Sequence, residues 1–153
     1  MNFFLREATI DDALLLFNWV NDEVVRLNSI NQDTILWENH LNWFSSRLNS
    51  NQTYIYILTD GKINYGQIRI DKYNNWWIID YSIDVNFRGK GLGSLIVKLL
   101  VEKNKGYNFK AIVKQNNPSS IHVFLKLGFK EVKGDLENMI YFEKTQIEIK
   151  KQH

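Results

Sequence analysis

The chain has 153 residues, of which 44% are hydrophobic and 24% are charged, and these values are ordinary for a single soluble globular domain. The formal net charge of +2 is too small for the electrostatic footprint of a nucleic-acid-binding protein. The absence of cysteine excludes disulfides and thiolate nucleophiles, and the three histidines (His40, His122 and His153) lack metal-ligand spacing. No apolar run could span a bilayer and the first residues show no signal-peptide pattern, so we expect a cytoplasmic protein with no membrane, metal or nucleic acid as a partner.

Taken in chain order, the first half predicts one strand, two helices and three more strands. Thr9, with Asp12 three residues later, is typical of a helix N-terminus, and apolar residues follow at helical spacing up to Phe17. Apolar residues recur at the spacing of a second helix between Trp37 and Leu48. The predicted strands, separated in the later part by turn residues, are Phe4–Ala8, Thr53–Thr59, Ile63–Ile70 and Trp76–Val85.

The second half predicts a helix, a strand, a second helix and two final strands. Leu92 begins a run of apolar residues with the period of an amphipathic helix. Asn117 and Pro118 are a typical N-cap and first residue of the next helix, which Gly128 ends. The predicted strands are Phe109–Val113, Phe129–Val132 and Met139–Lys144, the last two forming a hairpin. We place one domain at residues 1–146 and a charged C-terminal tail at residues 147–153.

A glycine-rich turn, Arg88-Gly89-Lys90-Gly91-Leu92-Gly93-Ser94, joins a predicted strand directly to the amphipathic helix. Glycine lets the backbone approach a ligand closely, and the unpaired N–H groups at a helix start favour an anion. Two cationic side chains in the same turn add positive charge. The pattern is neither a Walker loop, which needs Lys-Ser/Thr after its last glycine, nor a dinucleotide-binding fingerprint, which needs a third glycine further on. The turn therefore predicts a site for a diphosphate.

Two motifs at matching separation make the chain resemble the GNAT superfamily of N-acetyltransferases. The acetyl-CoA loop of that family, Arg/Gln-x-x-Gly-x-Gly/Ala, is matched by Arg88, Gly91 and Gly93. A second signature, Asn-x-x-Ser/Ala followed by Gly-Phe, is matched by Asn117, Ser120, Gly128 and Phe129. The order of predicted elements is similar over nearly the whole chain. The resemblance implies an α/β fold with a mixed, mostly antiparallel seven-stranded sheet that splays at its centre and is flanked by four helices.

The resemblance also implies acetyl-CoA as cofactor and transfer of its acetyl group to a primary amine. The backbone of the strand before the glycine turn would bind the pantetheine arm, and the amides of the turn would bind the pyrophosphate. Asn117 would reach the cofactor from the start of the last helix. The residues expected to bind the cofactor are Tyr81, Ser82, Ile83, Arg88, Gly89, Lys90, Gly91, Leu92, Gly93, Ser94, Asn117, Ser120 and Phe124.

Asp80 is our candidate for the general base, because it lies on the polar face of the strand before the glycine turn; a merely solvated carboxylate is the alternative. Many family members carry a tyrosine as general acid where this chain has Phe124. Tyr141 and a bound water are the alternatives for that role, unless the thiolate leaves without an acid. Ile112 stands where peptide-acetylating relatives often carry a glutamate, which weakens a ribosomal-protein or other peptide substrate.

The acceptor residues that we predict are Arg26, His40, Trp43 and Arg69. The segments around them resemble the sugar-nucleotide N-acetyltransferases of nonulosonic acid pathways, such as the pseudaminic-acid-type enzyme. Aromatic side chains stack on sugars and bases, and arginine pairs with diphosphates. We therefore expect a nucleotide-linked amino sugar as acceptor, and a homodimer is possible. The alternatives are a protein N-terminus, a polyamine bound by Asp11, Asp12, Asp22 and Glu23, and a CoA-binding regulatory module without activity.

Overall fold

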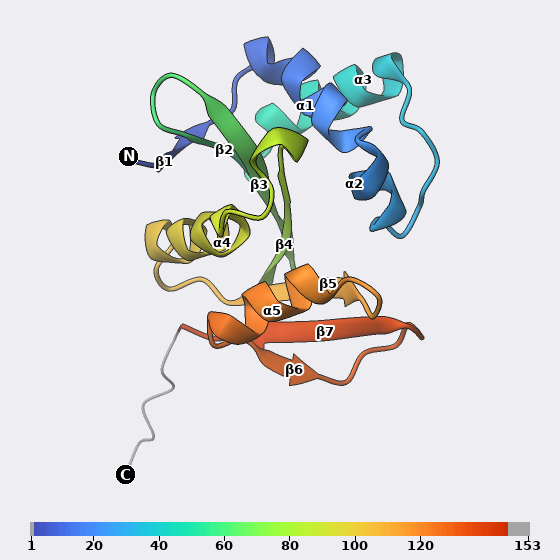
Figure 1. The fold of residues 1–153 in the computed structure, drawn as a ribbon, viewed down its shortest axis with the longest axis vertical. Coiled ribbons are helices and arrows are strands. Elements are labelled where there is room, and N and C mark those ends of the chain that lie inside the picture. Colours follow the sequence, from blue (N-terminus) through green and yellow to red (C-terminus); the bar gives the residue numbers. More distant parts are fainter. Residues whose placement is uncertain (1, 147–153) are drawn as a thin grey trace.

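A computed structural model describes residues 2–146 of the chain and shows a seven-stranded sheet in the order β1-β2-β3-β4-β5-β7-β6 (Figure 1). The strands are β1 (Phe4–Glu7), β2 (Thr53–Thr59), β3 (Asn64–Tyr73), β4 (Trp76–Ile83), β5 (Phe109–Lys114), β6 (Lys130–Val132) and β7 (Met139–Lys144). All neighbouring strands are antiparallel except β4 and β5, which are parallel. The predicted mixed, mostly antiparallel sheet is confirmed. The predicted tail at residues 147–153 lies outside the described residues.

The sheet splays between β4 and β5. These two strands pair only at Trp77 with Phe109 and at Ile78 with Lys110. Beyond these pairs the two strands are not paired with each other, up to Ile83 in β4 and Lys114 in β5. Figure 1 shows them diverging from that point. The splayed centre expected from the sequence is therefore present.

Helices cover both faces of the sheet. Helices α1 (Ala13–Val20) and α3 (Trp37–Leu48) pack on one face, and α4 (Leu92–Lys103) and α5 (Pro118–Lys126) on the other. Ile96, Leu100, Phe109 and Phe142 are fully buried in the larger core on the α4 and α5 face. Phe44 and Ile57 are fully buried in the smaller core under α1 and α3.

The four predicted helices are present, and a fifth, α2 (Glu23–Leu27), was not predicted. Its five residues are too few to give a helical period, and none of them is buried. The helix forms because the Asp22 side chain accepts hydrogen bonds from the amides of Val24 and Val25.

Strand bounds near the turns also differ from those predicted. Strand β3 extends to Tyr73 because its ladder with β4 continues to the pair Tyr73–Trp76. Strand β4 ends at Ile83, two residues early, because the Asp84 side chain accepts from the amide of Asn86 and caps a 3-10 turn at Val85–Phe87. Among the described residues, no helix has the length and apolar character needed to cross a bilayer.

Candidate cofactor and acceptor site

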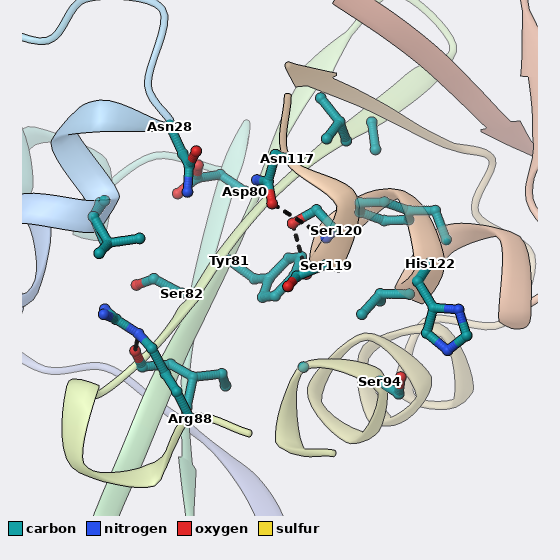
Figure 2. Close-up of a pocket in the computed structure, with 18 of the residues that line it drawn as sticks. Asn28, Asp80, Tyr81, Ser82, Arg88, Ser94, Asn117, Ser119, Ser120 and His122 are labelled. Carbon is teal, nitrogen blue, oxygen red and sulfur yellow. Dashed lines mark hydrogen bonds between the residues drawn. The ribbon is translucent and has the colours of Figure 1, made fainter. Parts of the chain in front are cut away.

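A cavity of about 500 Å³ lies where β4 and β5 separate (Figure 2). Its walls come from both splayed strands, from the glycine-rich turn and α4, from the first turns of α5, and from α2 with the residues after it. Of the residues predicted to bind the cofactor, all except Lys90 line this cavity. The sequence did not point to the α2 wall, which consists of Val24, Val25, Asn28 and Ser29.

The start of α4 is built to receive an anion. Gly91 is the N-cap, its φ of +78° is in the left-handed region, and no side chain caps the helix. The first N–H groups of a helix have no acceptor within the helix, and the helix dipole adds partial positive charge there. Gly89 has the same positive φ of +78°, which residues with a Cβ rarely adopt. The turn therefore presents backbone donors to the cavity, as a pyrophosphate requires.

The Tyr81 side chain projects from β4 and contacts both α4 and α5 at the wall of the cavity. Its hydroxyl is hydrogen-bonded to Oγ of Ser120 at 2.8 Å, and the amide of Ser120 donates to Oδ1 of Asn117 at 3.4 Å. A Cβ built on Gly93 would lie 3.4 Å from the Tyr81 ring, in van der Waals contact, so α4 packs closely on this side chain. Burial raises the pKa of the Tyr81 hydroxyl, against a smaller lowering by the bond to Ser120, so the group keeps its proton at neutral pH.

The structure places the two positions that the sequence suggested for a general acid, Phe124 and Tyr141, in different surroundings. Phe124 lines the cavity but has no hydroxyl, and its ring packs edge-on against Tyr81 with 6.0 Å between ring centres. Tyr141 does not line the cavity, and its hydroxyl accepts from the amide of Leu136 at 3.2 Å in the β6–β7 hairpin. The phenol that lines the cavity is that of Tyr81, for which the sequence predicted only a backbone contact to the cofactor. The alternation of side chains along β4 could have predicted this, because it places Tyr81 on the face opposite Asp80, where α5 packs.

Asp80 and Ser82 project from the opposite face of β4, and both line the cavity. The side-chain amide nitrogen of Gln67 on β3 donates to Oδ2 of Asp80 and to Oγ of Ser82, each at 3.2 Å. Asp80 is exposed. The Gln67 amide therefore orients this exposed carboxylate beside the cavity, and the guanidinium of Arg69 on β3 interacts with it electrostatically.

Arg69 lies next to Asp80 across the β3–β4 ladder but is not a wall of the cavity. Its Nε donates to Oδ2 of Asp71 at 2.8 Å, and its guanidinium carbon lies 4.9 Å from the centre of the Trp43 ring. Trp43 likewise does not line the cavity. Two predicted acceptor residues, Arg69 and Trp43, therefore contact each other beside Asp80 but outside the cavity.

The other two predicted acceptor residues are turned toward the protein backbone. Arg26 donates from Nε to the carbonyl of Val20 at 2.7 Å and from Nη1 to two carbonyls of the segment that follows α2. His40 is 4% exposed, and its Nε2 lies 2.9 Å from the carbonyl oxygen of Ala13, in a site where burial lowers its pKa. Neither side chain lines the cavity, so the structure gives both a part in holding α1, α2 and α3 together.

No group of three or more His, Cys, Asp or Glu side chains that could hold a metal ion occurs among residues 2–146. The cavity lining offers backbone amides at its glycine-rich end and, among its side chains, the Asp80 carboxylate, the Tyr81 hydroxyl and the His122 imidazole.

Comparison with known proteins agrees with this geometry. Residues 2–130 match the family described as the acetyltransferase (GNAT) domain. An uncharacterised protein of Methanocaldococcus jannaschii is 29% identical over an alignment of 148 residues that covers 91% of this chain and 30% of that protein. The chain thus spans less than a third of the curated relative that it matches.

Solved structures show the same fold. A domain from Methanocaldococcus jannaschii superposes with a TM-score of 0.82 at 25% identity, covering 94% of this chain and 98% of that one. Spermidine N-acetyltransferase from Vibrio cholerae, in complex with CoA and spermine, has a TM-score of 0.82 at 14% identity, covering 94% and 95%. The family match includes both splayed strands and the glycine-rich turn, so the chain belongs to the acetyltransferase (GNAT) domain family.

Proposed function

We propose that the chain transfers the acetyl group of acetyl-CoA directly to the primary amine of a nucleotide-linked amino sugar. One observation carries the transfer to an amine. A single cavity joins the uncapped, glycine-bounded start of α4 to the carboxylate of Asp80. The first feature suits the diphosphate of the cofactor, and the second suits an amine that must lose a proton.

The residues that fit the cofactor follow the cavity from α4 to the splay. The amides from Gly89 to Ser94 would hold the diphosphate, and the unpaired edge of β4 from Ile79 to Ile83 would hold the pantetheine arm. When bound, acetyl-CoA supplies a thioester carbonyl that an amine can attack. Asn117 and Ser120 line the same wall at the start of α5.

Asp80 is proposed as the base. With acetyl-CoA and an amine bound, a carboxylate oxygen of Asp80 would take the proton that the amine nitrogen loses on acetylation. Gln67 donates to Oδ2, so this bond fixes the orientation of the carboxyl group.

Tyr81 is proposed as the proton donor for the departing sulfur, in place of the tyrosine that is missing at Phe124. Its partly buried hydroxyl retains its proton at neutral pH and is oriented by its bond to Ser120; after donating, it would regain a proton from solvent. A thiol has an ordinary pKa of about 8.5, so this donor accelerates departure without being indispensable.

The acceptor class rests on a second groove next to the first cavity. This groove of about 590 Å³ shares Lys114 with the first cavity. It is lined by side-chain amides, by one carboxylate and by three apolar residues: Gln115, Asn116, Asn138, Glu137, Ile30, Leu136 and Met139. Amides and apolar contacts suit a sugar and a base, and Lys114 suits a phosphate.

A polyamine acceptor has less support. Two of the four carboxylates that the sequence offered for it are used elsewhere, because Asp12 is paired with Arg6 and Asp22 with Arg88, each at 2.8 Å. A peptide acceptor is disfavoured by Ile112, an apolar residue in the cavity wall.

An acceptor panel with thiol release as readout tests the proposal. Nucleotide-linked amino sugars, the same free amino sugars, N-terminal peptides and polyamines are compared at saturating acetyl-CoA. We expect the highest kcat/KM with a nucleotide-linked amino sugar. Thiol release with polyamines or peptides but with no sugar nucleotide would overturn the acceptor class, and CoA binding without thiol release from any amine would favour the regulatory module.

A further inference from the structure

Arg88 belongs to the glycine-rich turn, yet its guanidinium is bound on the acceptor side of the cavity. Its Nε donates to the carbonyl of Ile83 at 3.0 Å, and its Nη2 donates to Oδ2 of Asp22 at 2.8 Å. Figure 2 shows Arg88 on the side of the cavity where Asn28 lies, away from Ser94 on α4. The two bonds come from the Nε and Nη2 atoms, so they fix the direction of the side chain.

The carboxylate that receives Arg88 also begins α2. Oδ2 of Asp22 accepts the amides of Val24 at 3.0 Å and Val25 at 3.2 Å. The side chains of Arg88 and Asp22 are 29% and 19% exposed, so the ion pair is partly shielded from water. One oxygen atom therefore joins the cofactor turn to the first turn of α2.

Helix α2 depends on such contacts at its ends. It has five residues and none is buried, so apolar packing does little to fix its position. A helix this short is marginal by itself. Its other end is held by Lys114, whose Nζ donates to the carbonyl of Leu27 at 2.8 Å. Val24 and Val25 nevertheless form part of the cavity wall, next to the face of β4 that carries Asp80.

We propose that Arg88 is a positioning residue for the acceptor: by holding Asp22 it fixes α2 as the wall against which the amine binds, and it sets acceptor affinity rather than cofactor affinity. This inference rests on the proposed amine acceptor at Asp80. Pyrophosphate binding is left to the backbone amides of the turn. An arginine is needed because a lysine ammonium cannot bond to Ile83 and Asp22 in the same planar geometry.

The test uses three variants of the full chain. Arg88→Lys keeps the charge in the turn but loses the two-ended contact. Asp22→Asn keeps an acceptor for the amides of α2 but removes the ion pair. Lys90→Gln removes a charge from the same turn without any contact to α2, and serves as the matched control. Each is assayed for the KM of the amine, for the Kd of CoA by calorimetry, and for hydrogen exchange of the Arg26 and Asn28 amides.

Arg88→Lys and Asp22→Asn are expected to raise the amine KM by about fivefold, as for loss of a partly shielded ion pair, and to speed exchange in α2. The Kd of CoA should stay within about twofold of the wild-type value in both. Lys90→Gln should leave α2 exchange unchanged. A Kd of CoA that rises tenfold in Arg88→Lys but not in Asp22→Asn would make Arg88 a phosphate ligand and overturn the inference.

The same experiments distinguish failure of the proposed acetyl transfer from failure of the Arg88 inference. If no amine is acetylated, exchange and calorimetry still decide the inference without turnover. Wild-type exchange of α2 in both Arg88→Lys and Asp22→Asn would show that the ion pair does not hold this wall, whatever the acceptor.

Discussion

Replacing Gly91 by alanine tests whether the backbone of the glycine-rich turn holds the diphosphate. Gly91 has a φ of +78°, and a Cβ built there meets no atom within 4 Å. The substitution therefore introduces no clash, only the conformational cost of a left-handed alanine. That cost is about 1–2 kcal/mol, offset by about 0.4–1 kcal/mol because alanine also restricts the unfolded chain.

The expected net loss of stability is about 1 kcal/mol, which corresponds to a fall in Tm of about 2–4 °C for a chain of this length. The effect on cofactor binding should be larger. Strain at the N-cap turns the first amides of α4 away from a bound diphosphate, and a hydrogen bond to a charged group contributes about 1.5–3 kcal/mol. Losing one such bond raises the Kd of CoA by at least about tenfold.

Gly61→Ala is the matched control. Gly61 has a φ of +95° and equally free space around a Cβ, but it lies in the β2–β3 turn and does not line the cavity. Both variants should lose similar stability by thermal unfolding, and calorimetry should show weaker CoA binding only in Gly91→Ala. An unchanged Kd for CoA in Gly91→Ala, together with the expected fall in Tm, would refute the assignment of the pyrophosphate to these amides.

Three further outcomes are expected. Asp80→Asn should lower kcat by about a hundredfold with little change in the Kd of CoA, and an unaltered pH–rate profile would remove Asp80 from the mechanism. Tyr81→Phe should lower kcat most with slow acceptors and abolish any basic limb due to the phenol; equal activity at all pH values would show that the thiolate needs no donor. Burial raises the pKa of Asp12, but hydrogen bonds from Arg6 and from the amide of Thr9 outweigh this effect, so the net pKa is lowered. The ionised carboxylate therefore stabilises the folded state at pH values above the unfolded-state pKa of about 3.9. Asp12→Asn should therefore destabilise the protein at pH 7 and lose that effect as the pH falls below this value, in urea unfolding followed at several pH values.

The backbone of the cofactor site could be predicted because its signals are local. The glycines of the turn, the apolar period after Leu92, and the cap at Asn117 each lie within a few residues of the structure that they specify. The alternation along β4 correctly separated Asp80 from the buried face. The splay itself was expected only from the family resemblance.

The acceptor side could not be predicted as well, because its side chains find partners far along the chain. His40 bonds to the carbonyl of Ala13, 27 residues away, and Arg88 pairs with Asp22, 66 residues away. A histidine or arginine on a helix face or in a loop looks available for a ligand until such a partner is known. Helix α2 was missed for a local reason, because its five residues are too few to show a helical period and none of them is buried.

The short parallel pairing of β4 with β5 also bears on the order of the reaction. Side chains from both faces of β4 reach the same opening, so donor and acceptor can occupy it together from opposite sides. The chain has no cysteine to carry the acetyl group between two half-reactions. Such an opening is suited to a sequential scheme through a ternary complex, in which double-reciprocal plots intersect rather than run parallel.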